Sequence, residues 1–348
     1  MTALVPLPVI VPLFAAGLCL VLGRSARAQR VISLVALSLV VVVGAMLLAR
    51  VDAYGPQVMD VGGWTAPIGI SLVADRLSAL MLLVSAVVAL AVLVYSLGQG
   101  VVEYGRETPL SVYHPTYLVL VAGVSNAFLS GDLFNLYVGF EILLAASYVL
   151  LTLGGTGARI RAGTTYVIVS LVSSVIFLAA IAMIYAATGT VNLAQLAGRL
   201  DDLPDDVSLI LQLLLLTAFA IKAAVFPLSA WLPDSYPTAP APVTAVFAGL
   251  LTKVGVYAII RTQTLLFPDS PLSDVLMWAA LLTMIVGILG AVAQSDNAGA
   301  GARRGRTRTW GAAGDPAGSC SCALGVRPGA SRASCAPSSG ARARSSDA

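Results

Sequence analysis

The chain has 348 residues, of which 58% are hydrophobic and 11% are charged, and its formal net charge is +3. Soluble globular domains carry about 25% charged residues, so this composition excludes a soluble domain and predicts an integral membrane protein. Residues 1–295 carry 10 Arg and 2 Lys against 14 acidic residues, whereas residues 296–348 carry 8 Arg against 3 Asp. The total charge therefore says nothing about partners, and we expect no nucleic-acid partner.

Nine segments satisfy the length rule for membrane-spanning helices, which is about 20 mainly apolar residues. They predict an all-α, polytopic membrane protein with about nine transmembrane helices. The first segment ends at Gly23-Arg24 without a small-residue cleavage site, so we interpret it as a retained helix and not a signal peptide. The segments lie at 3–23, 31–49, 73–97, 113–130, 133–153, 164–188, 207–229, 239–261 and 273–294.

The distribution of Arg among short loops predicts the orientation of these helices. Positive charge collects in cytoplasmic loops, and Arg residues occupy loop 24–30 and loop 154–162, which lie on one side of a nine-helix chain. We therefore expect both loops in the cytoplasm and the N-terminus outside, in the cell membrane. The acidic loop around residues 201–206 then faces outward as a solvated surface.

Two boundaries between these segments have a local chemical explanation. Asp132 precedes the fifth segment and is a typical N-cap, because its carboxylate can accept hydrogen bonds from the first turn of a helix. Prolines interrupt the chain between Pro227 and Pro242, and each removes a backbone donor and crowds the preceding turn. This region predicts a broken helix or a re-entrant connection after the seventh segment.

Three ionisable residues fall inside the apolar segments: Glu141, Lys222 and Lys253. Charges within a membrane span are costly and usually mark an ion or proton path. We expect Glu141 to pair with Lys222, because each stabilises the charged form of the other. The pair could be an inert contact between two helices, or it could switch whether Lys222 holds a proton. In the second interpretation Lys253 is the next proton carrier.

Other polar residues near these charges have ordinary structural interpretations. The sixth segment contains Ser170, Ser173 and Ser174, which could bridge carriers through water but more often join helices. We assign none of them as a carrier. His114 is the only histidine, and its position at the start of the fourth segment predicts a capping or interfacial residue.

Three motifs around these charges resemble one known family. They are the strings from Asp132 to Glu141 (DLFNLYVGFE), from Lys222 to Pro237 (KAAVFPLSAWLPDSYP) and from Leu251 to Arg261 (LTKVGVYAIIR). Together they resemble the antiporter-like subunits shared by respiratory complex I and the multisubunit Mrp sodium/proton antiporters. The Trp231–Pro237 string is most similar to the D-type subunits (MnhD or MrpD). The resemblance covers residues 1 to about 295.

The resemblance implies specific roles and a specific architecture. It implies that Glu141, Lys222 and Lys253 are the glutamate of the fifth helix and the lysines of the seventh and eighth helices, forming part of a proton path. It also implies two inverted five-helix repeats in a chain of about fourteen helices. Three N-terminal helices would occupy residues 1–98 and the first repeat, with its broken seventh helix, residues 113–262. Only the first helix of the second repeat, 273–294, would follow.

The last part of the chain departs from that family pattern. Residues 296–348 contain mainly Ala, Gly, Arg, Ser and Pro, without an apolar period, and such segments do not fold alone. We interpret them as a disordered basic tail that is out of frame, so that the chain is truncated or frameshifted after about residue 295. The alternative is a cytoplasmic tail that touches anionic lipid. Cys320 and Cys322 are too weak a signal to predict a metal site.

These observations favour a transporter subunit over an enzyme. We expect a membrane subunit of a cation (Na⁺)/proton antiporter, without a cofactor or metal, whose partners are the other subunits of a hetero-oligomeric complex, the lipid bilayer, protons and Na⁺. One alternative is a proton-pumping membrane subunit of an NADH-quinone oxidoreductase or a membrane-bound hydrogenase. Another is a truncated product that is inactive in transport.

Overall fold

A computed structural model describes residues 2–23, 25–98, 110–153, 157–235, 239–268 and 270–293. The chain divides into two units, Met1–Gln294 and Ser295–Ala348. The predicted tail at 296–348, including Cys320 and Cys322, lies outside the described residues. All of the described residues therefore belong to the first unit.

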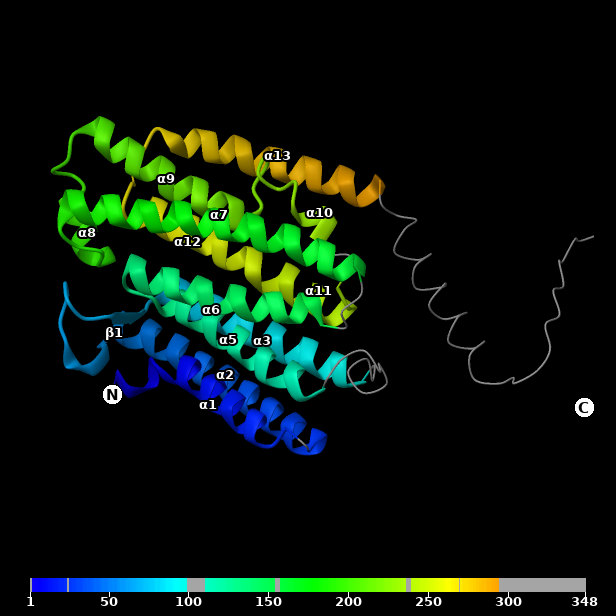
Figure 1. Ribbon diagram of the computed structural model, residues 1–348. Coiled ribbons are helices and arrows are strands. Elements are labelled where there is room, and N and C mark those ends of the chain that lie inside the picture. Colours follow the sequence, from blue (N-terminus) through cyan, green and yellow to red (C-terminus); the bar gives the residue numbers. More distant parts are fainter. Residues whose placement is uncertain are drawn as a thin grey trace, which may run out of the picture. The chain divides into compact units, whose positions relative to one another are not determined.

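Long helices that run side by side form the first unit (Figure 1). Eight of the described helices are long and apolar enough to cross a membrane, and α1 is a shorter apolar helix of 15 residues. The predicted all-α membrane class is confirmed. The first half contains η1 (Thr2–Leu4), α1 (Leu7–Val21), α2 (Ala26–Tyr54), α3 (Arg76–Gly98), α5 (Leu110–Leu129) and α6 (Leu133–Thr152). The second half contains α7 (Gly157–Thr188), α8 (Leu193–Arg199), α9 (Asp205–Ala223), α10 (Leu232–Ser235), α11 (Ala241–Val246), α12 (Thr252–Leu265) and α13 (Leu272–Ala293).

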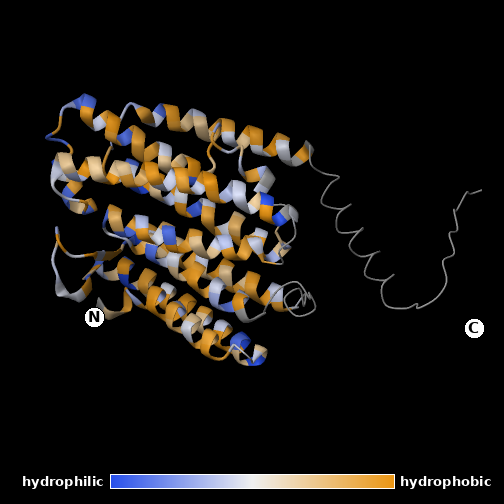
Figure 2. Ribbon diagram, in the orientation of Figure 1, coloured by the Kyte–Doolittle hydropathy of each residue, from blue (hydrophilic) through white to orange (hydrophobic). Residues whose placement is uncertain are grey.

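The hydropathy of the helices fits a membrane setting. Apolar residues cover the long helices along most of their length, whereas hydrophilic residues gather mainly near the helix ends (Figure 2). Many of these apolar side chains are exposed, for example Phe14 at 69% and Val175 at 67%. A soluble protein would bury such side chains, so the exposed apolar belt is consistent with contact to lipid.

A small β-structure that the sequence did not predict closes one end of the bundle. Strand β1 (Gln57–Asp60) pairs antiparallel with β2 (Ser71–Ala74), and the 3-10 turn η2 (Val61–Gly63) follows β1. Isolated bridges extend this hairpin from Leu72 to Ser130 and from Asp132 to Asn192. We call this end of the bundle the hairpin end. It contains the start of α6, and Asp132 caps that helix as predicted, because Asn135 N donates to its Oδ1 at 2.6 Å.

Helices α5 and α6 approach each other so closely that two positions in their contact require glycine. A Cβ atom at Gly123 would lie 2.6 Å from the backbone nitrogen of Leu143, and one at Gly139 would lie 2.9 Å from that of Ala127. Small residues at such contacts let membrane helices pack backbone to backbone. The pairing holds α6, and therefore Glu141, firmly against the centre of the bundle.

The predicted break in the seventh segment is present, but the regular helix ends earlier than predicted. Helix α9 stops at Ala223 and not at 229, and Ala224 adopts a left-handed conformation with φ 54° and ψ 46°. After the break, α10 has only four residues. The next span consists of α11, the π-helix η4 (Phe247–Leu251) and α12.

Candidate functional site

Three helices bring Glu141, Ser174 and Lys222 into one hydrogen-bonded chain. Glu141 lies on α6, Ser174 on α7 and Lys222 in the last turn of α9. Lys222 Nζ donates to Ser174 Oγ at 3.0 Å, and Ser174 Oγ donates to Glu141 Oε1 at 2.5 Å. The two charged residues are therefore neighbours, as predicted, but a hydroxyl joins them. Among the described residues there is no direct ion pair between them.

The environment of Lys222 explains why a cation can occupy this position. Its side chain is only 8% exposed, and its Nζ lies 4.9 Å from the ring centre of Phe140. A ring face attracts a cation, and the last turn of a helix carries partial negative charge. Glu141, which is partly buried, supplies the full negative charge nearby.

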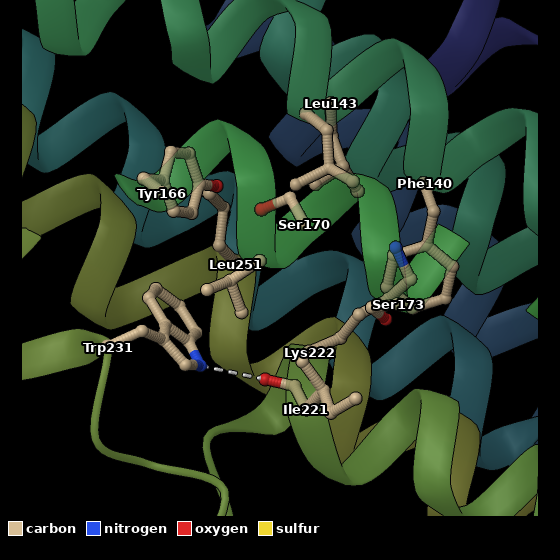
Figure 3. A pocket seen from close by; sticks show the side chains of 11 residues that line it. Phe140, Leu143, Tyr166, Ser170, Ser173, Ile221, Lys222, Trp231 and Leu251 are labelled. Carbon is tan, nitrogen blue, oxygen red and sulfur yellow. Dashed lines mark hydrogen bonds between the residues drawn. The ribbon is translucent and has the colours of Figure 1, made fainter. Parts of the chain in front are cut away.

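The broken segment covers the end of α9 with an aromatic side chain. Trp231 Nε1 donates to the carbonyl oxygen of Ile221 at 3.1 Å (Figure 3). This carbonyl lies in the last turn of the helix, where main-chain acceptors lose their usual partners. The Ile221 carbonyl also accepts from Ala224 N at 3.2 Å, so the indole adds a second donor there and fixes the loop beside Lys222.

A small cavity adjoins the amine of Lys222 (Figure 3). Its volume is about 20 Å³, which is enough for about one water molecule. Its polar wall includes Ser170, Ser173 and Lys222, and Trp231 lies on the side of the broken segment. The cavity has the size and the polar partners that a bound water needs.

The third predicted carrier, Lys253, lies elsewhere. Its side chain is exposed and shares a stripe of α12 with Val256 and Ile260, which are 41% and 42% exposed. Its Nζ donates to the carbonyl oxygen of Ala248 at 2.9 Å, inside the π-helix, a rare element that often marks functional sites. Lys253 lies inside an apolar span as predicted, but its side chain is exposed in the described chain, because the buried side of α12 is formed by other residues. The structure does not bring it to Glu141 and Lys222.

Sequence reasoning also misplaced His114 and left Ser174 unassigned. His114 is fully buried near the start of α5, and it does not act as a cap, because both of its ring nitrogens lack a hydrogen-bond partner among the described residues. Ser174 is one of several serines on α7, and periodicity alone could not single it out. Its position on α7, facing both Glu141 and Lys222, is the signal that only the tertiary structure supplies.

A second polar network ties the hairpin end together and was not predicted. Arg261 on α12 pairs with Asp75, which precedes α3. The same guanidinium donates to Tyr257 Oη at 3.1 and 3.2 Å, and Tyr257 donates to the carbonyl oxygen of Phe128 at 2.9 Å. Three helices, α3, α5 and α12, are joined in this way. Across the described part of the chain there is no group of three or more potential metal ligands.

Comparisons with known proteins agree with this arrangement. Residues 130–297 match the family model described as NADH:quinone oxidoreductase/Mrp antiporter, transmembrane region. The chain is 40% identical over 299 residues to the D subunit of the Na⁺/H⁺ antiporter of Bacillus subtilis, covering 85% of this chain and 60% of that protein. The corresponding D subunit of Alkalihalophilus pseudofirmus gives the same identity and coverage. Residues 130–297 are therefore similar to this family of antiporter-like membrane subunits, and the similarity to the D subunits extends over 299 residues.

Solved structures of this family extend the comparison to the fold. The Mrp complex from Dietzia sp. matches with a TM-score of 0.75 at 33% identity, covering 84% of this chain and 55% of that one. The membrane-bound sulfane sulfur reductase, an archaeal respiratory membrane complex, matches with a TM-score of 0.71 at 30% identity, covering 82% and 57%. The antiporter-like fold is therefore shown. The chain spans about 60% of the length of the curated relatives it matches.

Proposed function

We propose that this chain is a membrane subunit of a cation (Na⁺)/proton antiporter, in which buried side chains conduct protons. The observation that carries the proposal is the chain Lys222–Ser174–Glu141, which joins a base, a hydroxyl and a carboxylate across three helices. The similarity to the D subunits of Na⁺/H⁺ antiporters supports the reaction class. Transport, rather than catalysis of a chemical reaction, is therefore the activity we assign.

The hydrogen-bond directions specify how a proton would move. When Lys222 gives a proton to Ser174 Oγ, the hydroxyl proton of Ser174 passes to Glu141 Oε1. One N–H bond breaks, one carboxyl O–H bond forms, and Ser174 ends as a hydroxyl. The pair changes from two charges to two neutral groups, and the balance between these states is set by desolvation against mutual attraction.

The membrane potential is large enough to drive this change. One elementary charge that crosses 100 mV gains about 2.3 kcal/mol, whereas one pKa unit corresponds to about 1.4 kcal/mol. Modest coupling can therefore load and unload Lys222 during transport. A water in the cavity beside Lys222 would connect the amine to the broken segment around Trp231.

We assign Lys253 as the carrier that follows Lys222. It is exposed here on α12, where another helix or subunit would cover it.

We also propose that the helices follow the repeat architecture. Residues 113–262 form the first five-helix repeat, and residues 273–294 form the start of the second. The starts of α2 and α7, which carry Arg27, Arg30, Arg159 and Arg161, lie at the end of the bundle opposite the hairpin end (Figure 1). This placement supports a cytoplasmic position for that end and an N-terminus outside.

The partners follow from the same assignment. The solved relatives are parts of multisubunit membrane complexes, and we propose that this subunit works within a hetero-oligomeric antiporter complex that exchanges protons for Na⁺. The alternative is a proton-pumping subunit of a redox complex such as an NADH-quinone oxidoreductase or hydrogenase. It is supported by the 30% identity to the archaeal respiratory complex. The higher identity to antiporter subunits favours the first assignment.

The experiment uses membrane vesicles that contain this subunit with the other subunits of its complex. We expect Glu141→Ala and Lys222→Ala each to lower sodium-dependent proton flux by about 100-fold or more, the usual loss when a proton-transfer group is removed. Asp274→Ala, at an exposed carboxylate in the first turn of α13, is the matched control and should leave the flux unchanged. Wild-type flux in both Glu141→Ala and Lys222→Ala would refute the assignment.

A further inference from the structure

A second buried carboxyl, Asp132, lies at the start of the helix that carries Glu141 and is not explained by its capping role. The residue is 4% exposed. Its Oδ1 accepts from Asn135 N at 2.6 Å, which completes the cap. Its Oδ2 is buried and accepts no hydrogen bond of good geometry among the described residues, although the backbone N–H groups of Phe134 and Ser71 lie near the carboxyl. A cap needs only one side-chain oxygen. A buried polar atom without a partner is costly and needs another explanation.

The surroundings of Asp132 hold this carboxyl in place. Asp132 and Asn192 form an isolated bridge, and Asn192 Nδ2 donates to Ser71 Oγ at 3.0 Å. Ser130 Oγ donates to the carbonyl oxygen of Asp132 at 2.9 Å. The strand β2, the turn before α6 and the segment before α8 therefore enclose the residue from three sides. If the carboxyl turned away, it would lose its hydrogen bond from Asn135 N.

Asp132 also lines a pocket that is bounded by the loop of residues 67–70 and by helix α7. The pocket has a volume of about 320 Å³. Its other walls include Phe134 of α6 and Leu178, Ile181 and Tyr185 of α7. Asp132 thus lies beside a pocket at the hairpin end, next to the first turn of α6 and the later turns of α7.

Helical spacing places two residues of the pocket on the same helix faces as Glu141 and Ser174. Phe134 precedes Glu141 by seven residues, about two turns, so both lie on one face of α6. Leu178 follows Ser174 by four residues on α7, which also places the two on one face. Nine residues separate Asp132 from Glu141, about 13.5 Å along the helix axis.

We propose that Asp132 is a further proton-binding residue, through which the Lys222–Ser174–Glu141 chain exchanges protons with the hairpin end of the bundle. The inference rests on the proposed function. The side chains that line the pocket beside Asp132 are mainly apolar, so a proton passes between Asp132 and Glu141 only when water enters between them. Burial raises the pKa of the Asp132 carboxyl, although nearby backbone N–H groups offset part of the rise, and this favours the protonated form.

Few other charges face this carboxyl. Tyr185 is the remaining titratable group in the same pocket. Asp60 and Arg261 line the neighbouring pocket, which shares Asn192 with the first. Because Arg261 is already paired with Asp75, it does not provide a free countercharge for Asp132.

The decisive variant is Asp132→Asn in the assembled complex, because Asn caps a helix about as well as Asp but cannot bind the proton. Asp132→Ser supplies a second neutral cap if the first variant assembles poorly. Asp60→Asn makes the same chemical change at a carboxyl on the same end and is the matched control. We expect Asp132→Asn to assemble normally, to lower sodium-dependent proton flux by about 10-fold or more, and to lose an infrared band of a protonated carboxyl. Asp60→Asn should keep both.

The outcomes separate this inference from the proposed function. If Lys222→Ala is inactive while both neutral variants of Asp132 retain wild-type flux and the infrared band, the proton path stands and Asp132 is only a helix cap. If Lys222→Ala and Asp132→Asn both retain wild-type flux, the proposed function fails as well. Loss of flux and of the band in Asp132→Asn, with both retained in Asp60→Asn, supports the inference.

Discussion

At the scale of single residues, the hydroxyl of Ser174 has the most consequential position in the molecule. It accepts from Lys222 and donates to Glu141 at the same time, so each end of the charge pair depends on it. Two opposite charges that are joined by a hydrogen-bonded hydroxyl are better satisfied than two isolated buried charges. Ser174 therefore joins the two helices and is also the group through which a proton can pass between Lys222 and Glu141.

Removal of this hydroxyl should separate the two charged residues. We predict that Ser174→Ala lowers sodium-dependent proton flux by about 10-fold to 100-fold, because the relay loses its middle group. Ser174→Thr, which keeps a hydroxyl, should retain most of the flux. The measurement is a dye-based proton flux assay in vesicles with matched amounts of complex.

Ser85→Ala is a suitable control for this prediction. Ser85 is a buried serine of α3 whose Oγ donates to the carbonyl oxygen of Leu82 within its own helix. Its loss costs a comparable hydrogen bond without touching Glu141 or Lys222. Equal flux in Ser174→Ala and Ser85→Ala would show that Ser174 only joins helices.

At the scale of elements, the placement of Lys222 depends on how α9 ends and on what packs against that end. Ala224 adopts a left-handed conformation, which costs about 1–2 kcal/mol for a residue with a Cβ. Helix α12 approaches so closely at this point that a Cβ atom at Gly255 would lie 2.7 Å from the backbone nitrogen of Ala223. The break in α9 is therefore held by tertiary contact as well as by the prolines that come after it.

A methyl group at this contact should disturb the end of α9. We predict that Gly255→Ala destabilises the protein by about 1–3 kcal/mol, the usual cost of overpacking, and that it lowers proton flux because Lys222 is displaced. Thermal unfolding of the purified protein in detergent measures the first effect. Gly287→Ala is the control, since a Cβ atom there meets nothing within 4 Å. Equal stability of both variants would show that α12 can move away without cost.

At the scale of the whole molecule, the sequence predicts the helices well and their faces poorly. The Asp132 cap and the break after Lys222 follow from local rules about capping and proline, and both are confirmed. The hairpin was missed because its two strands have only four residues each. Its bridge from Leu72 to Ser130 joins segments far apart in the sequence, which local patterns do not reveal. The exposure of the Lys253 side chain could not be predicted, because hydropathy identifies a membrane span but does not show which neighbours cover each of its faces.

The network at Asp75 shows how distant elements are joined in a way that periodicity cannot reveal. Asp75 and Arg261 are 186 residues apart, and their ion pair joins the start of α3 to the last turns of α12. Burial raises the pKa of Asp75, but the hydrogen bonds and charge of Arg261 together with Ser78 outweigh this effect and lower the pKa below its ordinary value of 3.8. The folded protein therefore binds the Asp75 proton less tightly than the unfolded chain does.

This linkage predicts a pH dependence of stability with a defined sign. A carboxyl whose pKa is lowered by folding stabilises the protein above its unfolded pKa, and that contribution is lost as the pH falls through the folded value. We predict that Asp75→Asn loses about 1–3 kcal/mol of stability at neutral pH, as expected for a hydrogen bond between charged groups. Its stability should then fall less steeply than that of the wild type below about pH 4. Thermal unfolding in detergent across this pH range measures both effects.

The contact between Asp52 and Arg76 provides the control, because its 3.1 Å ion pair is formed by side chains that are each 75% exposed. Exposed pairs contribute about 0–1 kcal/mol, so Asp52→Asn should leave the stability and its pH profile nearly unchanged. If Asp75→Asn behaves like Asp52→Asn, then Arg261 finds another partner and the hairpin end is held mainly by apolar packing. A distinct acid profile for Asp75→Asn alone would instead establish that the ion pair couples α3 to α12.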